Sequence, residues 1–236
     1  MFIALIGPRS SGKSTIKEYL VNKGFTALAL DPHGVDQWYA NNKPPKSSTH
    51  QTDSPTTDGN SVLIFPSPPA LLEYITTRWA ADFVTTALNT RDLVALCSRR
   101  PAFLLVRVDA PLGLRFIRSG GKANMDLEQF MEEDDHIEFG SGSSGWEQAE
   151  DKGLRALRRA VHVHISNIYP AAAQLHTHLD AINLLDPERL RPGWDTYFMT
   201  MASLASHRSN CMKRRVGAVL MRAGASAYAC MRRKTP

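Results

Sequence analysis

The residues that most directly indicate chemistry form a loop near the start of the chain. Residues 7–14 (GPRSSGKS) match the pattern G-x-x-x-x-G-K-[ST] at every fixed position. In such a loop the glycines let backbone N–H groups face a phosphate, and the start of the following helix adds favourable partial charge. The lysine is expected to reach terminal phosphates, and the following hydroxyls to hold Mg²⁺. The pattern predicts a phosphate-binding site made of Gly7, Ser11, Gly12, Lys13, Ser14 and Thr15.

Two further pairs of side chains could serve this phosphate site. Asp31 and Asp109 follow predicted strands and are candidates to organise the water shell of Mg²⁺, although a strand-end Asp equally often caps the next turn or helix. Arg115 and Arg118 share a helix face that could close as a lid over phosphates, and solvated arginines are the alternative. The third predicted strand ends in residues 65–67 (FPS), without the acidic residue expected of a working kinase. The loop could therefore bind a nucleotide without turning it over.

Alternating strands and helices are predicted to position these residues. Short apolar runs that end at Gly, Pro or Asp predict buried strands over residues 1–6, 25–30, 62–65 and 103–108. The spacing of apolar residues predicts helices over residues 13–22, 71–88, 147–168 and 171–184. This alternation predicts the α/β fold class, a parallel sheet flanked by helices, with ligands at the carboxyl ends of the strands.

The predicted domain organisation has two parts. Residues 1–185 form a P-loop nucleotide-binding domain, in which residues 41–60, rich in Pro, Ser, Thr, Asp and Asn, form a mobile insertion. Residues 186–192 form a linker. Residues 193–222 hold a helix with an apolar face, produced by spacings of three and four, and then a strand. Residues 223–236 show no period and form a divergent tail.

Composition and charge narrow the class of protein. Of the 236 residues, 43% are hydrophobic and 22% are charged, as in an ordinary globular protein, and no apolar run approaches the ~20 residues that cross a bilayer. Three cysteines without a C-x-x-C pair favour a reducing compartment. We expect a cytoplasmic protein without a membrane partner, with the nucleus as an alternative location. Basic residues cluster at 213–215 and 232–234, but nucleic acid is not the partner we favour.

His136 and Glu138 form an H-x-E pair, the first half of the zinc-deaminase signature in which His binds zinc and Glu transfers protons. That signature also requires P-C-x-x-C further along the chain, and no Pro-Cys occurs in this sequence. The pair lies in an acidic stretch, residues 131–140 (MEEDDHIEFG). We interpret it as surface, and we predict neither a catalytic residue nor a metal ligand in this chain.

Residues 190–220 (LRPGWDTYFMTMASLASHRSNCMKRRVGAVL) closely resemble the start of the catalytic domain of fungal deoxycytidylate (dCMP) deaminases. In that family the W-D-x-Y-F-M helix and the R-S-N-C-M-K-R-R-V-G-A-V strand entry precede the sheet that carries the zinc site. Residues 186–189 (DPER) are similar to the family's linker. Residues 78–79 and 103–111, with Arg115 and Arg118, are similar to the P-loop extension of fungal members, which resembles dephospho-coenzyme A kinase and nucleoside-monophosphate kinases.

The resemblance implies hydrolytic deamination of dCMP to dUMP, in pyrimidine deoxynucleotide synthesis, by a nucleotide-regulated homo-oligomer that uses Zn²⁺. Residues 193–222 match only the first helix and strand of its cytidine-deaminase-like α/β/α domain. The motifs H-A-E, P-C-x-x-C and G-Y-N-G are absent after Leu220, and the sequence leaves the family pattern at about Arg222. We therefore expect a truncated family member without deaminase activity. A retained intron or a shifted reading frame is our hypothesis for the tail.

Three hypotheses about function remain open. The first, which we prefer, is a dCMP deaminase relative whose P-loop domain is regulatory or vestigial and binds ATP or another nucleoside triphosphate with Mg²⁺. The second is a P-loop kinase acting on a nucleotide or nucleoside. The third is a non-catalytic protein whose basic segments contact nucleic acid, in which case its binding should weaken steeply with salt.

Overall fold

The computed structural model describes residues 1–41, 56–58, 62–120, 126–140, 153–220 and 228–230. It divides the chain into unit 1, Met1–Leu184, and unit 2, Leu185–Pro236. Within the described part of the chain, no helix is long and apolar enough to cross a membrane.

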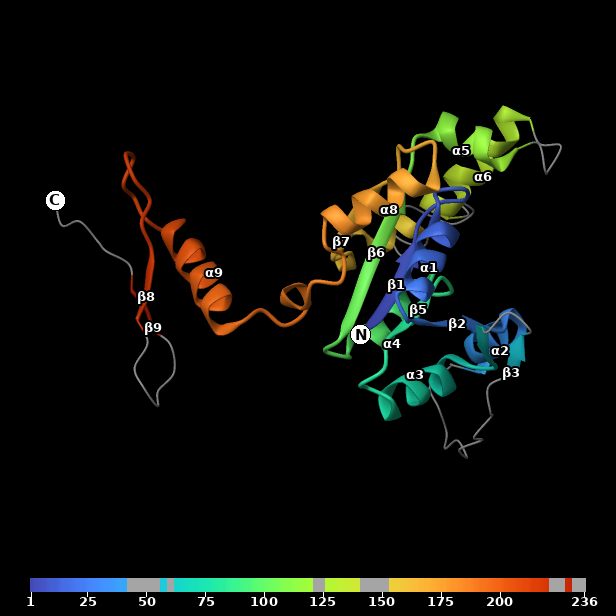
Figure 1. Ribbon diagram of the computed structural model, residues 1–236, viewed down its shortest axis with the longest axis horizontal. Helices are drawn as coiled ribbons and strands as arrows, with labels where there is room; N and C mark the ends of the chain where they lie inside the picture. Colours follow the sequence, from blue (N-terminus) through green and yellow to red (C-terminus); the bar gives the residue numbers. More distant parts are fainter. Residues whose placement is uncertain (42–55, 59–61, 121–125, 141–152, 221–227, 231–236) are drawn as a thin grey trace. The chain divides into compact units, whose positions relative to one another are not determined.

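Unit 1 is built on a seven-stranded sheet with the strand order β3-β4-β2-β5-β1-β6-β7 (Figure 1). The strands are β1 (Phe2–Ile6), β2 (Thr26–Leu30), β3 (Thr56–Asp58), β4 (Val62–Phe65), β5 (Phe83–Thr85), β6 (Phe103–Asp109) and β7 (Val163–Ser166). Every neighbouring pair is parallel except β3 and β4, which pair in the antiparallel direction. The predicted α/β fold class, a parallel sheet flanked by helices, is confirmed.

Helices connect these strands, because parallel neighbours require a crossover. They are α1 (Lys13–Asn22), α2 (Pro32–Asn41), α3 (Pro68–Thr77), α4 (Arg91–Ser98), α5 (Leu112–Ser119), α6 (Leu127–Phe139), the 3-10 helix η1 (Leu154–Ala160) and α8 (Ala172–Ala181). Helix α1 packs beside α8, and η1 packs beside both α4 and α6. The bounds of α1 confirm the helix predicted from the sequence.

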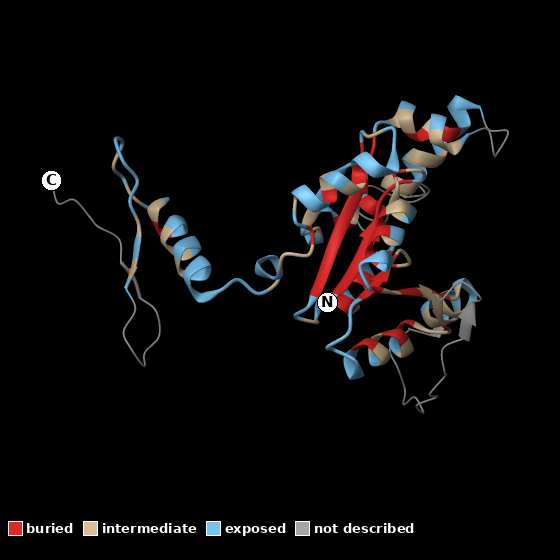
Figure 2. Ribbon diagram, viewed as in Figure 1, coloured by how far each residue is buried: buried red, intermediate tan, exposed pale blue. Residues whose placement is uncertain are grey.

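The central strands of the sheet are buried (Figure 2), and apolar residues face both sides of it. All five residues of β1 are buried, and so are six of the seven residues of β6. Alternate side chains of a strand point to opposite faces. Phe2, Ala4 and Ile6 join the main apolar cluster of unit 1, whereas Ile3 and Leu5, on the other face, are equally shielded from water. Burial on both faces explains why β1 reads as an unbroken apolar run.

The structure corrects two helix predictions, because each range contains a strand. The helix predicted over residues 71–88 is α3, which ends at Thr77 and is followed by β5, between β1 and β2 in the sheet. In the range 147–168, the described residues form η1 and then β7, which pairs with β6. Both strands have only three or four residues, too few to establish a period of two, and their partners are distant in the sequence.

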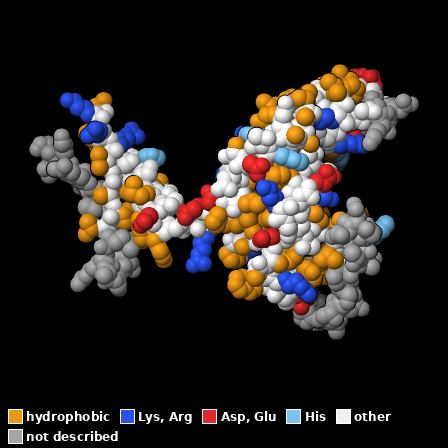
Figure 3. Space-filling model, viewed as in Figure 1, with side chains coloured by type: hydrophobic (Ala, Val, Ile, Leu, Met, Phe, Trp, Pro, Cys, Tyr) orange, Lys and Arg blue, Asp and Glu red, His pale blue; other side chains and the backbone are white. Residues whose placement is uncertain are grey.

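The mobile insertion predicted over residues 41–60 falls largely outside the described residues. Within that range Asn41 ends α2, and Thr56–Asp58 forms β3 against β4. At the surface of unit 1, apolar side chains gather over α5 and α6 (Figure 3). The large exposed apolar residues of these two helices are Ile117, Leu127, Met131 and Phe139.

Unit 2 contains the 3-10 helix η2 (Pro187–Arg189), the helix α9 (Trp194–Ser206) and an antiparallel pair of strands, β8 (Ala218–Leu220) and β9 (Tyr228–Cys230). Helix α9 packs against β8. Gly217 makes this approach close, because a Cβ there would lie 2.1 Å from the carbonyl oxygen of Ala202. The helix and strand predicted for residues 193–222 are confirmed, whereas β9 was not predicted. Residues 221–227 and 231–236 lie outside the described part.

Candidate phosphate-binding site

The loop between β1 and α1 has a backbone that only glycine accommodates at two positions. Gly7 has φ +150° and Gly12 has φ +103°, a region that disfavours other residues. A Cβ on Gly7 would lie 2.0 Å from the carbonyl oxygen of Val108, and one on Gly12 would lie 2.3 Å from Nδ2 of Asn167. No side chain caps the start of α1, whose first residues line the cavity described below, so a ligand there would meet uncapped N–H groups. The two glycines thus let the loop turn tightly beside β6 and the residue that follows β7.

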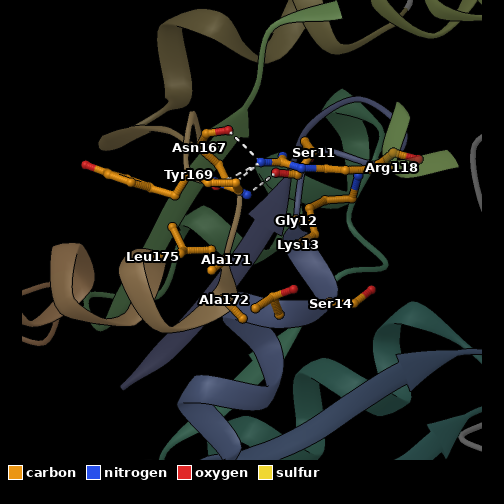
Figure 4. A pocket seen from close by; sticks show the side chains of 13 residues that line it. Ser11, Gly12, Lys13, Ser14, Arg118, Asn167, Tyr169, Ala171, Ala172 and Leu175 are labelled. Carbon is orange, nitrogen blue, oxygen red and sulfur yellow. Dashed lines mark hydrogen bonds between the residues drawn. The ribbon is translucent and has the colours of Figure 1, made fainter. Parts of the chain in front are cut away.

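A cavity of about 430 Å³ lies against this loop (Figure 4). Its lining comes from Ser10–Thr15, from Arg118 of α5, from the segment that joins β7 to α8, and from the start of α8. Among the described residues, the buried Oγ of Ser11 and the buried Nη1 of Arg118 have no hydrogen-bond partner. Buried polar groups are normally paired, so two unpaired donors on residues of this lining are consistent with a polar ligand at the site. Both can donate a hydrogen bond, as an anionic ligand requires.

The side chain of Lys13 is held by backbone carbonyl groups of the loop. Its Nζ donates hydrogen bonds to the carbonyl oxygens of Gly7, at 2.7 Å, and Pro8, at 2.5 Å. Burial and, to a smaller extent, the positive charge of nearby Arg115 together lower the pKa of Lys13 to about 8. The charged form of Lys13 is therefore destabilised in the absence of a nearby anion, and a phosphate bound beside it would stabilise that form.

Arg118 is anchored over the loop by the segment that follows β7. Its Nη2 donates to the carbonyl oxygens of Tyr169, at 2.6 Å, and Asn167, at 3.3 Å. The side chain of Asn167 in turn donates to the carbonyl oxygen of Ser11, at 2.9 Å. Asn167 thus joins the loop to the arginine (Figure 4). The sequence analysis missed this residue, because the four-residue strand β7 that ends just before it is too short to be recognised from its sequence.

Arg115, the other arginine predicted for a lid, is directed elsewhere. It is buried, and both oxygens of Asp134 on α6 accept hydrogen bonds from its guanidinium, while its Nε donates to the carbonyl oxygen of Ala110 at 2.8 Å. The hydrogen bonds with Asp134 raise its pKa further. Arg115 is not among the described residues that line the cavity. It fixes α6 to α5 and acts on Lys13 through its charge alone.

The two aspartates predicted to assist Mg²⁺ instead hydrogen-bond to nearby backbone. Asp31 accepts from the N–H of His33 at 3.3 Å, at the start of α2, and Asp109 accepts from the N–H of Ala110 at 2.8 Å. Neither is among the described residues that line the cavity. Of the two strands beside β1, β5 ends in Thr85, whose buried hydroxyl accepts from the N–H of Ala87 at 3.2 Å. The site thus offers Mg²⁺ the hydroxyls of Ser14 and Thr15, without a carboxylate in the described lining.

The residues that the structure describes do not fit a zinc site. Glu138 of the H-x-E pair accepts two hydrogen bonds of 2.9 Å from Nη2 of Arg107, a buried residue of β6. In the described residues, no three His, Cys, Asp or Glu side chains are grouped so that they could hold a metal ion. Glu138 instead compensates the charge of Arg107, an ion pair that joins α6 to the sheet.

The chain is homologous to fungal deoxycytidylate deaminases over most of its length. It is 38% identical over 225 residues to the deoxycytidylate deaminase of Schizosaccharomyces pombe, an alignment that covers 93% of this chain and 62% of that protein. It is 28% identical over 170 residues to the deoxycytidylate deaminase of Saccharomyces cerevisiae, covering 66% of this chain and 51% of the relative. The chain therefore spans between half and two thirds of the length of these curated relatives. No family model matches the chain.

Solved structures with a similar fold are more distant. A shikimate kinase from Acinetobacter baumannii is 15% identical with a TM-score of 0.43, and the match covers 79% of this chain and 94% of that one. A sugar kinase from Janibacter sp. HTCC2649 is 15% identical with a TM-score of 0.41, covering 81% and 95%. The strand order and the loop of this chain, rather than these similarities, define its fold class.

Proposed function

We propose that unit 1 binds a nucleoside triphosphate at the loop formed by residues 7–14, as the nucleotide-binding part of a protein of the dCMP deaminase family. The observation that carries this proposal is the cavity beside Lys13, in which Ser11 and Arg118 present donors without partners. A triphosphate would accept from these donors and from the N–H groups at the start of α1. It would also relieve the cost of burying the Lys13 ammonium.

Calorimetric titration with Mg-ATP and Mg-dCTP tests the nucleotide site. The wild-type chain is expected to bind at least one of them, and Lys13→Ala is expected to abolish that binding. Lys17→Ala is the matched control, because it removes the same charge one turn further along α1 and does not line the cavity. Binding by Lys13→Ala as tight as that of the wild type would contradict the proposal.

Sequence similarity supports the second part of the proposal, a relationship to dCMP deaminases. The 38% identity over 225 residues extends well beyond the loop motif, which by itself occurs in many unrelated proteins. The segment 190–220, which forms α9 and β8, carries the resemblance to the catalytic domain. Under this proposal the family's substrate is dCMP, the protein assembles as a homo-oligomer, and a nucleotide bound to unit 1 regulates it.

We further propose that the polypeptide of residues 1–236 does not itself deaminate dCMP. Its sequence supplies an H-x-E pair whose glutamate is paired with Arg107, and it has no P-C-x-x-C. The test is an assay of dUMP formation from dCMP with added Zn²⁺, followed by chromatography. We expect no product above the background without protein. Zinc-dependent formation of dUMP, removed by a chelator, would overturn this part.

Phosphoryl transfer is the alternative function for unit 1. A second cavity that also reaches Lys13 favours it, whereas the end of β5 in Thr85 weighs against it because a kinase usually places a carboxylate there. Release of ADP from ATP by the wild-type chain, but not by Lys13→Ala, would support this alternative over binding without turnover.

A further inference from the structure

A second cavity, of about 400 Å³, lies against the loop and also reaches Lys13. Its lining brings together parts of the chain that are far apart in the sequence. Gly7, Arg9 and Lys13 come from the loop and the start of α1, Asn89 precedes α4, and Glu133 and Ile137 lie on one face of α6. Buried Leu154 of η1 completes the described wall. Lys13 alone is shared with the described lining of the first cavity.

The chemistry of this second cavity is that of a site for a small anion with an organic body. Arg9 and Lys13 supply two positive charges against the single carboxylate of Glu133, so the lining carries a net positive charge. Ile137 and Leu154 offer an apolar wall, and the amide of Asn89 can both donate and accept hydrogen bonds. The volume lies within the usual range of small-molecule sites, roughly 300–1,000 Å³.

Arg9 is the cation that a ligand could recruit. Its Nη1 donates to both oxygens of Glu133 at 2.8 Å, but the two side chains are 49% and 37% exposed. Ion pairs of that exposure contribute little to stability, so an incoming anion can replace Glu133 at low cost. The other two ion pairs of α6, Arg107 with Glu138 and Arg115 with Asp134, are much less exposed. They would hold α6 in place while Arg9 changes partner.

We propose that this cavity binds a nucleoside monophosphate, with its phosphate on Arg9 and Lys13 and its organic body between Asn89, Ile137 and Leu154. The proposal extends the nucleotide site proposed for the loop, because the two cavities meet at Lys13 and would place two phosphate-bearing ligands on either side of one ammonium. Each ligand would then influence the affinity for the other through that shared charge.

The test is calorimetric titration of the full chain with dCMP, in the absence and in the presence of saturating Mg²⁺ and a non-hydrolysable ATP analogue. We expect dCMP to bind in both conditions and deoxycytidine, which lacks the phosphate, to bind at least roughly tenfold more weakly. Arg9→Gln and Asn89→Ala should each weaken dCMP binding, Arg9→Gln by roughly tenfold or more. Arg99→Gln is the matched control, because Arg99 is an exposed arginine outside both cavities.

Three results would overturn the proposal: no binding of dCMP, complete competition between dCMP and the ATP analogue, or unchanged dCMP affinity in both Arg9→Gln and Asn89→Ala. The variant Asn89→Ala also separates this proposal from the one it extends, since residue 89 does not line the first cavity. Loss of dCMP binding with normal ATP-analogue binding assigns the second cavity. Failure of the wild type to bind the ATP analogue, with dCMP binding that depends on Arg9, would refute the triphosphate site and leave this one standing.

Discussion

Asp134→Asn should destabilise unit 1 far more than Glu133→Gln, although the two residues are neighbours on α6 and each pairs with an arginine. The side chains of the Arg115–Asp134 pair are 7% and 17% exposed, compared with 49% and 37% for Arg9–Glu133. Removing one partner of a buried pair leaves an uncompensated charge, which costs about 3–5 kcal/mol. The exposed pair contributes only about 0–1 kcal/mol.

The expected loss for Asp134→Asn is somewhat smaller than that range, about 2–3 kcal/mol, because Arg115 keeps its bond to the Ala110 carbonyl and the asparagine oxygen can still accept. For a domain of this size, that loss corresponds to a fall of about 4–12 °C in Tm. Urea and thermal unfolding of both variants, followed by circular dichroism, measure the difference. Equal destabilisation by the two substitutions would refute the argument that burial decides the strength of these pairs.

Three further predictions concern the loop and unit 2. The affinity for Mg-ATP should fall above pH 8, by up to about tenfold per pH unit, because Lys13 has a pKa of about 8 and must then take up a proton to bind phosphate. Calorimetry at several pH values should show that Lys13→Arg, which keeps its charge, removes this dependence. Gly12→Ala should abolish nucleotide binding even if the chain folds, since its Cβ would lie 2.3 Å from Nδ2 of Asn167 at φ +103°, and retained affinity would contradict the geometry. Gly217→Val should increase hydrogen exchange in α9 and β8 while leaving the amides of β1 protected, because the new side chain would force β8 away from the carbonyl of Ala202. Unchanged exchange in α9 would show that this contact does not hold unit 2 together.

Local sequence was sufficient to predict the central strand, the loop and the first helix. Residues 2–6 are apolar because β1 is buried on both faces, and the two glycines and Lys13 mark the turn into α1. These signals lie within about twenty consecutive residues, so no distant partner was needed to interpret them. The apolar spacing of α9 likewise predicts a helix from local sequence, although Trp194, Tyr197 and Leu204 of that apolar set are exposed and Ala205 is the buried one.

Tertiary structure decided which residues meet around that loop. β5 and β7 are too short to be recognised from their sequences, and the pairing of β7 with β6 places Asn167 beside the loop. Arg115 and Arg118 lie three residues apart and share one helix face by sequence, yet Arg115 forms an ion pair with Asp134 of α6, whereas Arg118 lines the cavity. Spacing along a helix predicts the side of the helix on which a side chain lies. The role of that side chain depends on partners from other elements, here Asp134, 19 residues from Arg115, and Asn167, 49 residues from Arg118.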